Sequence, residues 1–398
     1  MRNTRRLLAA AGALGMLALT ACGPASASGS SGSAKSGEIN VMAISVLQSS
    51  SLSFPDESAA MQANVDTINA AGGIGGKKIN LIVCNDQFDP NVAAKCARQA
   101  ASDDVAAVLE PFEPYTEQID PILQAAGIPM VYSEFSTTTD GSSPTAFLRD
   151  AGVPGGYASL GLGLAKEGCK KIGAVVVQES NNLLGEKWLA NGAKIGGVPV
   201  VQAPVTQDQA DFSSPVAKLA SQGADCLVPD TLPQQGAKVV SAAAQSGHRL
   251  RLGAISAEFA APQLAALGSA ANGMLLTGQN YQPSDTSVPA VKAVLDGMAK
   301  YSPKVPLQDN FGIGGWASVT GLAEVLKSVH GPVTKDSVMQ AAAKASYDTG
   351  LYASFSASSP PPVSAFPRAK NWSYLTWTVQ HGKPVLKSRR FIPVPAGL

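Results

Sequence analysis

The feature that most constrains the fold of this chain is a series of short, nearly continuous apolar runs separated by alanine-rich segments. The runs favour β-branched residues and do not alternate with polar ones, which is typical of strands covered on both faces. They comprise residues 39–44, 79–84, 105–109, 128–132, 172–177, 198–201, 226–228, 252–255 and 274–277. Strands that alternate with helices form parallel sheets with right-handed crossovers. The sequence therefore predicts an α/β fold.

The segments between the runs carry helix signals. In residues 57–70, Met61, Val65 and Ile68 recur at helical spacing and give one buried stripe. Asp89 and Pro90 open another segment with an N-cap residue and a proline in the first turn. Further helices are predicted at residues 91–101, 212–222, 316–329 and 335–345. Near the end of the chain, residues 374–379 alternate with period two and predict a strand, followed by a turn at residues 382–384.

The order of these elements occurs twice. The first three strands of residues 38–150 and of residues 152–280 match in layout: a starting strand, a second strand after a helix, and a third after another helix. The chain is also longer than a single hydrophobic core usually serves. We therefore predict two similar α/β lobes, each with an open sheet in which the first strand lies between the second and the third.

The start of the chain has the pattern of a secretory signal. A cationic stretch, residues 1–6, precedes an apolar run at residues 7–18 and the lipobox Leu19-Thr20-Ala21-Cys22. The run is shorter than the roughly 20 apolar residues of a membrane span. We predict a lipoprotein signal peptide over residues 1–21, a lipid on Cys22 and a flexible Ser/Gly-rich linker over residues 22–37. The protein is then expected at the extracytoplasmic face of a bacterial cell membrane; an ordinary signal peptide with a chance cysteine is the alternative.

Four cysteines remain after Cys22, namely Cys84, Cys96, Cys169 and Cys226. An even number in an oxidising compartment favours disulfides. None has metal-ligand spacing, so we predict no metal site. In a sheet whose first and third strands are neighbours, Cys169 and Cys226 come within disulfide reach. We predict the pairs Cys84–Cys96 and Cys169–Cys226, one in each lobe, with free thiols as the alternative.

Composition and motifs exclude other classes of function. Lys plus Arg total 30 against 29 Asp plus Glu, with no basic run beyond the start of the chain, which argues against nucleic-acid binding. The sequence contains no nucleophile elbow, zinc-peptidase helix or phosphate-binding loop, and its three histidines are scattered. We therefore expect neither an enzyme nor a cofactor.

One string of residues is specific to a family. Residues 68–79, INAAGGIGGKKI, describe a helix end, a glycine turn and the start of a strand. The matching strings that follow are Cys84-Asn85-Asp86, Asp89-Pro90, Ala126-Gly127-Ile128-Pro129-Met130 with Ser136-Thr137, and Asp211-Phe212-Ser213. On these residues the chain resembles the type I periplasmic solute-binding proteins of ABC transporters, in the branched-chain amino acid (leucine/isoleucine/valine-binding) class. The resemblance covers essentially all of residues 38–398.

The resemblance implies two Rossmann-like lobes with parallel sheets, joined by a three-strand hinge, with ligand in the cleft between them. It assigns residues 38–150 and 282–352 to lobe one, and residues 151–281 and 353–398 to lobe two. The second crossover is expected near Tyr281 and the third at residues 352–355. The implied partners are a small-molecule ligand and an ABC permease and ATPase complex, and we expect a monomer.

Candidate ligand-binding residues follow the predicted strands, because ligands of open α/β sheets bind beyond the carboxyl ends of the strands. The resemblance implies that Ser136, with the Phe135 backbone, holds a carboxylate, and that residues near Ser256 and Glu258 face an amino group. Glu113 stands where the family has a small hydroxyl. The remaining candidates are Tyr115, Leu184, Asp230 and Tyr281.

Five candidates have a structural alternative: a helix cap for Ser136, a solvated loop carboxylate for Asp230 and Glu258, and packing at a lobe edge for the two tyrosines. The chain also departs from the family, since Asn182-Leu183-Leu184-Gly185 stands near the position of a ligand-contacting tyrosine. We therefore predict a small amphipathic ligand, an amino acid or a related amide or acid.

The expected function is that of a lipid-anchored solute-binding protein of an ABC importer. A ligand-sensing receptor domain that signals to a membrane partner is the alternative. A lipid-anchored hydrolase is a third reading, which the missing nucleophile motifs disfavour.

Overall fold

The computed structural model describes residues 37–49, 53–177, 183–231, 233–395 and 398. The predicted signal peptide, Cys22 and almost all of the predicted linker lie outside the described residues. Residues 35–398 form one compact unit. Within the described part of the chain, none of the helices combines the length and the apolar character needed to cross a membrane.

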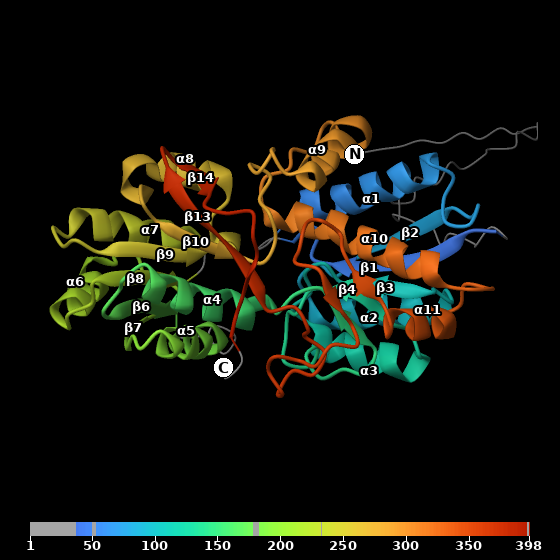
Figure 1. Cartoon of the computed structure of the whole chain (residues 1–398), viewed down its shortest axis with the longest axis horizontal. Helices are drawn as coiled ribbons and strands as arrows, with labels where there is room; N and C mark the ends of the chain where they lie inside the picture. Colours follow the sequence, from blue (N-terminus) through green and yellow to red (C-terminus); the bar gives the residue numbers. More distant parts are fainter. Residues whose placement is uncertain (1–36, 50–52, 178–182, 232, 396–397) are drawn as a thin grey trace, which may run out of the picture. The chain divides into compact units, whose positions relative to one another are not determined.

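The first sheet has five parallel strands in the order β2-β1-β3-β4-β5. They are β1 (Ile39–Ser45), β2 (Ile79–Asn85), β3 (Ala107–Leu109), β4 (Met130–Ser133) and β5 (Ala146–Leu148). Helices cover both faces (Figure 1): on one side are α1 (Pro55–Ala70), α9 (Pro289–Tyr301) and α10 (Asn310–Ser328), and on the other are α2 (Pro90–Ser102) and α3 (Thr116–Ala126). α11 (Lys335–Ala342) packs on α10.

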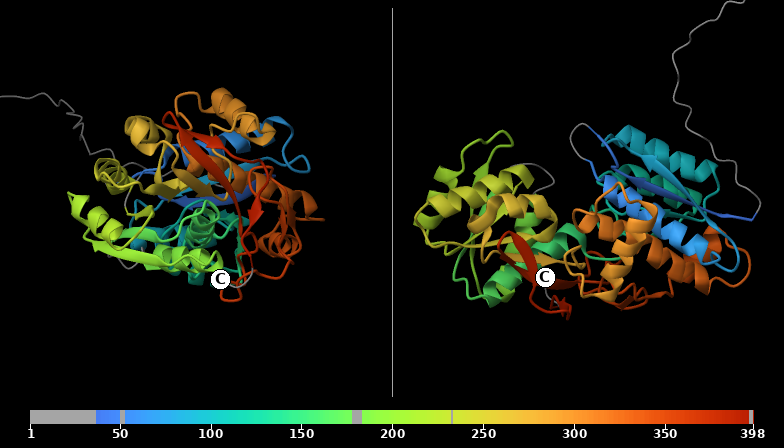
Figure 2. Two further views of the ribbon diagram at one scale, coloured as in Figure 1. Left: turned by 60° about the vertical axis from the view of Figure 1, so that its left-hand side comes forward. Right: turned by 90° about the horizontal axis from the view of Figure 1, so that it is seen from above.

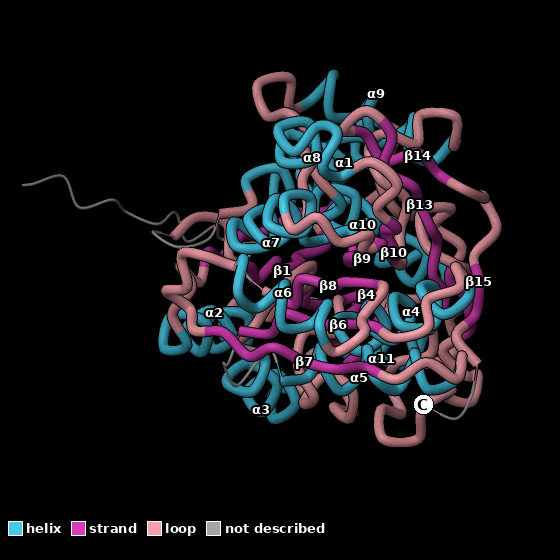
Figure 3. Tube along the Cα trace, turned by 90° about the vertical axis from the view of Figure 1, so that its left-hand side faces the viewer, coloured by secondary structure: helices cyan, strands magenta, loops and turns pink. Residues whose placement is uncertain are grey.

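The second sheet begins with five parallel strands in the order β7-β6-β8-β9-β10 and continues with antiparallel β13 and β14. The parallel strands are β6 (Ile172–Val177), β7 (Val200–Val205), β8 (Cys226–Asp230), β9 (Arg251–Ile255) and β10 (Leu275–Gly278). The antiparallel ones are β13 (Ser373–Gln380), β14 (Lys383–Leu386) and β15 (Ile392–Pro393), which pairs with β13. α4 (Gly152–Lys166) and α5 (Leu183–Ile195) pack together on one face, and α6 (Ser213–Ser221), α7 (Pro233–Gln245) and α8 (Ala261–Leu267) lie on the other (Figures 1 and 3).

The short elements complete the fold. Two 3₁₀ turns, η1 (Ser256–Glu258) and η2 (Gly268–Ala271), flank α8. β11 (Ser346–Tyr347) and β12 (Phe355–Ser356) form a separate two-stranded ribbon.

The α/β fold with two mainly parallel sheets confirms the predicted class, and in both sheets the first strand lies between the second and the third. Two details of the prediction were wrong. β5 was missed because its apolar run is only three residues long. The turn after β13 consists of His381 and Gly382, whose φ angles are both positive, and not of residues 382–384. A two-residue hairpin needs positive φ at both turn positions, so Lys383 and Pro384 already belong to β14.

The chain segments that connect the two sheets are bonded to one another. Asn280 forms an antiparallel bridge with Tyr352, and the Tyr281 N–H donates to the Leu351 carbonyl (3.2 Å). The side-chain amide of Asn371 donates to the Arg149 carbonyl (2.9 Å). The contacts of Asn280 and Tyr281 with residues 351–352 lie where the second and third crossovers were expected. The lobe boundaries themselves stay a prediction.

Helices from the last third of the chain return to the first sheet, as the resemblance implied. The Asn64 amide in α1 donates to the Trp316 carbonyl (2.7 Å) and to the Thr320 hydroxyl (2.8 Å) in α10. Figure 2 shows α1 in blue beside the orange helices. A stretch distant in sequence is therefore part of the first core.

Two disulfides join the pairs predicted from the sequence. Cys84–Cys96 links β2 to α2, and Cys169–Cys226 links the turn after α4 to β8. Their sequence separations are 12 and 57 residues. For loops of these lengths the chain-entropy model gives about 3 and about 4 kcal/mol of stabilisation.

Candidate functional site

Two adjoining pockets lie at the carboxyl ends of the strands. The larger has a volume of about 540 Å³ and the smaller about 110 Å³. Both are lined by Phe112, Val153 and Ile255, so they are parts of one cavity. The loops after β3 and β4 line it from the first sheet, and α4, β8 and β9 line it from the second.

The larger pocket is acidic and partly apolar. Its carboxyl groups are those of Glu117, Asp230 and Glu258, and its described lining includes no lysine, arginine or histidine. Hydroxyl groups come from Tyr115, Ser136, Thr137, Thr138, Tyr157 and Thr231. This lining suits a guest that offers hydrogen-bond donors or a positive charge at one end and an apolar surface at the other.

Tyr157 in α4 connects the two buried carboxyl groups. Its hydroxyl lies 2.7 Å from Asp230 Oδ1 and within hydrogen-bond distance of Glu258 Oε1. The second oxygens, Asp230 Oδ2 and Glu258 Oε2, are buried without a hydrogen-bond partner in the part of the chain that the structure describes. Each carboxyl group therefore has an acceptor available for a donor in the pocket.

The protonation of this group follows from its geometry. A phenol has one proton and can donate to only one of the two carboxyl oxygens, so the second contact needs a proton from a carboxyl group. Burial raises the pKa of Glu258 well above its usual range, against the Tyr157 hydrogen bond, which lowers it. Burial raises the pKa of Asp230 to about 7. Burial therefore favours the protonated form of Glu258, which can supply the proton for the second contact.

The first turn of α5 closes over Asp230. A Cβ atom at Gly185 would lie 3.0 Å from both carboxyl oxygens of Asp230 and 2.8 Å from the Tyr157 ring. Glycine is required there because the helix backbone approaches the carboxyl group so closely. Leu183 and Leu184 begin this helix, and their side chains lie outside the described residues.

On the opposite wall, the backbone amides expected to hold a carboxylate are already bonded. The N–H groups of Ser136 and Thr137 both donate to Asp140 Oδ2, at 2.8 and 2.9 Å. The Phe135 N–H donates to Asp150 Oδ1 (3.3 Å). Ser136 Oγ accepts from the Glu113 N–H (3.2 Å) and lines the larger pocket.

Three predicted residues line neither pocket. Glu113 is fully buried, and its Oε1 accepts from the Tyr115 N–H (2.7 Å). Burial, and then the charge of Asp86, raise the pKa of Glu113. The ring of Phe135 packs against Phe366. The hydroxyl of Tyr281 donates to the Arg389 carbonyl (2.8 Å) and its ring packs on Phe391, which is packing at the edge of the second sheet.

The other predicted residues whose side chains the structure describes reach the cavity. Tyr115 lines the larger pocket, and its hydroxyl donates to the Phe88 carbonyl (3.2 Å). Asp230 and Glu258 line it from the second sheet. Ser256 lines the smaller pocket, where its Oγ accepts from Gln282 Nε2 (3.1 Å).

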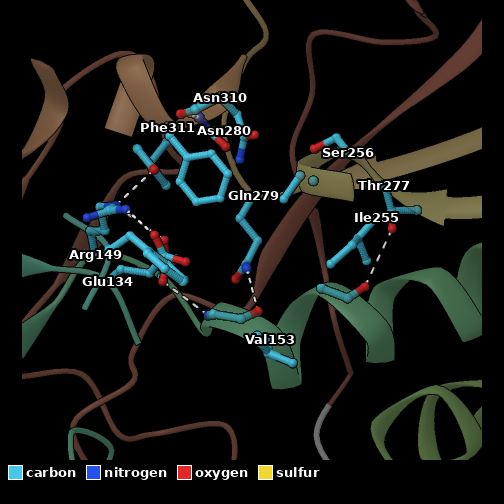
Figure 4. A pocket seen from close by; sticks show the side chains of 17 residues that line it. Glu134, Arg149, Val153, Ile255, Ser256, Thr277, Gln279, Asn280, Asn310 and Phe311 are labelled. Atoms are coloured by element: carbon cyan, nitrogen blue, oxygen red, sulfur yellow. Dashed lines mark hydrogen bonds and ion pairs between the residues drawn. The ribbon is translucent and has the colours of Figure 1, made fainter. Parts of the chain in front are cut away.

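The smaller pocket lies against the crossover segments (Figure 4). Arg149 is buried and donates to Glu134 Oε2 (2.7 Å), the Tyr352 hydroxyl (2.8 Å) and the Pro111 carbonyl (2.6 Å). Gln279 accepts from the Ala151 N–H and donates to the Gly152 carbonyl, both at 2.8 Å. Arg149 is the only arginine in the lining of this pocket that the structure describes. Its donors are already bonded to protein groups, so Arg149 holds the crossover segments together.

Sequence reasoning missed Tyr157 and Arg149. Tyr157 is the one aromatic residue of the otherwise aliphatic and glycine-rich α4, and that contrast is the signal that could have identified it. Arg149 precedes Asp150 at the end of β5, a strand the sequence pattern did not reveal. Among the described residues, no group of three or more His, Cys, Asp or Glu side chains could hold a metal ion.

Comparison with known proteins gives a family match and fold matches. The model of a family described as periplasmic binding protein matches residues 45–361. None of the curated proteins compared with the chain matches it in sequence.

Several solved structures share the fold. A branched chain amino acid ABC transporter from Thermus thermophilus with bound valine has a TM-score of 0.75 and 15% identity, covering 89% of this chain and 96% of that one. A fatty acid ABC transporter substrate-binding protein from Thermomonospora curvata has a TM-score of 0.74 and 18% identity, covering 90% and 93%. A solute binding protein from R. palustris in complex with benzoate has a TM-score of 0.70 and 18% identity, covering 90% and 99%. At these identities the likeness shows the fold alone.

Proposed function

The chain belongs to the periplasmic binding protein family, and on this basis we propose that it is an extracytoplasmic, lipid-anchored solute-binding protein of an ABC importer. The observation that carries the proposal is the cavity between the strand ends of the two sheets, beside the crossover segments. A ligand that contacts both walls stabilises the arrangement in which both are near it. A permease and ATPase complex that recognises this arrangement then receives the ligand.

The lining supports a small amphipathic ligand, an amino acid or a related amide or acid. On this proposal, the donor or ammonium group of the ligand lies at Asp230 and Glu258. Each of these carboxyl groups has an unpartnered buried oxygen within the described part of the chain. The apolar part lies against Phe112, Val153 and Ile255. The Ser136 and Thr137 amides are bonded to Asp140, which favours an amide or amine over a ligand bound through its carboxylate.

Three matched compounds test this choice: valine, valinamide, which lacks the carboxylate, and isovalerate, which lacks the amine. A ligand at 100 times its dissociation constant adds about 2.7 kcal/mol to the free energy of unfolding, so a thermal shift is readily measured. We expect valinamide to raise the melting temperature most and isovalerate to leave it unchanged. Stabilisation by isovalerate alone would contradict the donor-end assignment.

Substitution links the effect to the site. We expect Asp230→Asn to weaken binding of the amine compound by about tenfold, since a hydrogen bond to a charged group is worth about 1.5–3 kcal/mol. Asp104→Asn is the matched control, because Asp104 is exposed and precedes β3 at the opposite end of the strand. Equal loss in both variants would remove Asp230 from the site.

The lipid anchor is tested separately. The lipobox Leu19-Thr20-Ala21-Cys22 supports lipidation of Cys22. We expect Cys22→Ser to move the protein from the membrane fraction to the soluble extracytoplasmic fraction, measured by immunoblot after fractionation. Continued sedimentation of the processed variant with membranes would rule out this anchor.

A further inference from the structure

A third pocket, of about 50 Å³, lies beside β5 and shares no lining residue with the ligand cavity. β5 forms one wall, Tyr347 and Phe355 of the β11–β12 ribbon form another, and Arg368 and Lys370 complete it. Its volume exceeds the roughly 10–15 Å³ that a single water needs on the same measure, so a small polyatomic guest fits.

Two buried hydrogen-bond donors of this pocket have no partner among the described residues. Tyr347 is only 2% exposed, and its hydroxyl forms no hydrogen bond with any described residue. The same holds for Arg368 Nη2. The rest of the guanidinium is fixed, because Nε donates to the Ala146 carbonyl (2.6 Å) and the group lies over the Phe147 ring at 4.6 Å from its centre. A buried donor without an acceptor is unfavourable, so a guest that accepts hydrogen bonds is favoured here.

The charges around the pocket are not balanced. Arg368 and Lys370 both line it, no carboxylate does, and neither cation forms an ion pair among the described residues. Burial lowers the pKa of Arg368, and burial together with the charge of Arg368 lowers the pKa of Lys370. Burial, and then the charge of Glu324, raise the pKa of Tyr347, but the Glu324 carboxylate accepts the Asp348 N–H (3.2 Å) and lies outside the lining. An anion would neutralise two crowded cations.

We propose that this pocket binds a small oxyanion, a phosphate or carboxylate group, through the Tyr347 hydroxyl, Arg368 Nη2 and the Lys370 ammonium. An oxyanion has acceptors and no competing positive charge, which matches two unpartnered donors and two cations. Water could accept the two hydrogen bonds but would leave the charges unbalanced. The site is separate from the ligand cavity, so the test of anion binding does not depend on whether the proposed transport function is correct.

Equilibrium dialysis of the purified protein with radiolabelled inorganic phosphate, and separately with acetate, tests the proposal in a chloride-free buffer. We expect one phosphate or one acetate per chain. Arg368→Gln should weaken binding about tenfold or more, since it removes a charge and the unpartnered donor. Tyr347→Phe should weaken it about fivefold while keeping the ring and the fold, because within the described part of the chain the hydroxyl has no partner to lose.

Arg98→Gln is the control for general charge, because Arg98 is exposed on α2 and its substitution removes the same charge outside the pocket lining. It should change binding by less than twofold. The proposal is overturned if neither anion binds saturably to the wild-type protein. It is also overturned if Arg98→Gln weakens binding as much as Arg368→Gln, or if Tyr347→Phe and Arg368→Gln both bind like wild type.

Discussion

At the scale of single residues, the two buried carboxyl groups of the ligand cavity are joined by the Tyr157 hydroxyl, which has only one proton to donate. Tyr157, Asp230 and Glu258 are all buried, and they come from α4, β8 and η1. The Tyr157 hydrogen bond lowers the pKa of Asp230, which burial raises to about 7. The bond therefore stabilises the ionised form of Asp230 and matters most above that pH.

We expect Tyr157→Phe to destabilise the protein by about 1–3 kcal/mol at pH 8, the usual cost of a buried polar group that loses its partner. The loss should be smaller at pH 5, because Asp230 is then protonated and carries no charge to stabilise. Urea unfolding at the two pH values measures both. Tyr301→Phe is the control, because no hydrogen bond from the Tyr301 hydroxyl is seen among the described residues, and phenylalanine keeps the ring that packs against the hydrophobic core and beneath the Lys300 ammonium. An equal loss at both pH values would contradict the charge argument.

At the scale of elements, α4 and α5 meet backbone to backbone. A Cβ at Gly192 would lie 1.9 Å from the Ala158 carbonyl oxygen, and one at Gly161 would lie 2.2 Å from the Leu189 carbonyl oxygen. α4 begins at Gly152, shortly after the last strand of the first sheet, and carries Tyr157, and α5 begins over Asp230. The two glycines therefore set the separation of the helices that frame one wall of the cavity.

We expect Gly192→Ala to lower the free energy of unfolding by about 1–3 kcal/mol, because the methyl group forces the helices apart. This is opposite in sign to helix propensity, which favours alanine over glycine by about 1 kcal/mol. Gly156→Ala in α4 is the matched control: its Cβ would have only ordinary contacts, 3.4 Å or more from Ile255. Urea denaturation measures the free energy of unfolding of both variants. Stabilisation by Gly192→Ala would show that the two helices do not pack this closely.

At the scale of the whole molecule, the buried carboxyl groups of the described residues outnumber the buried cations. Burial, then the charge of Asp140, raises the pKa of Asp120 to about 8. Burial raises the pKa of Asp140 to about 6 and that of Asp230 to about 7. An unfolded aspartate titrates near pH 3.9, so the folded protein binds more protons than the unfolded chain between about pH 4 and pH 8.

Stability should therefore increase as the pH falls from 8 to 5. The sign follows from linkage: where the folded state holds more protons, raising the pH lowers the free energy of unfolding. Each unit of upward pKa shift corresponds to about 1.4 kcal/mol, so the change should be clear in urea midpoints. Asp208 and Asp211, whose pKa values are lowered by local hydrogen bonds, act with the opposite sign only at lower pH.

Asp120→Asn isolates one contribution, and we expect it to flatten the pH dependence and to raise stability at pH 8. A midpoint that falls on acidification from pH 8 to pH 5 would contradict the assignment of these groups as buried acids.

The sequence by itself determined the class of fold, because continuous β-branched runs and helical stripes are local patterns that burial on two faces requires. It also determined the disulfide pairs and the return of helices to the first sheet, through spacing and family resemblance. It did not determine which polar groups are already paired. Asp140 takes the amides of Ser136 and Thr137, and Tyr157 meets Asp230 and Glu258 across 73 and 101 residues of sequence. Such partners are chosen by tertiary packing, because a hydrogen bond depends on distances of a few tenths of an ångström that no local pattern encodes.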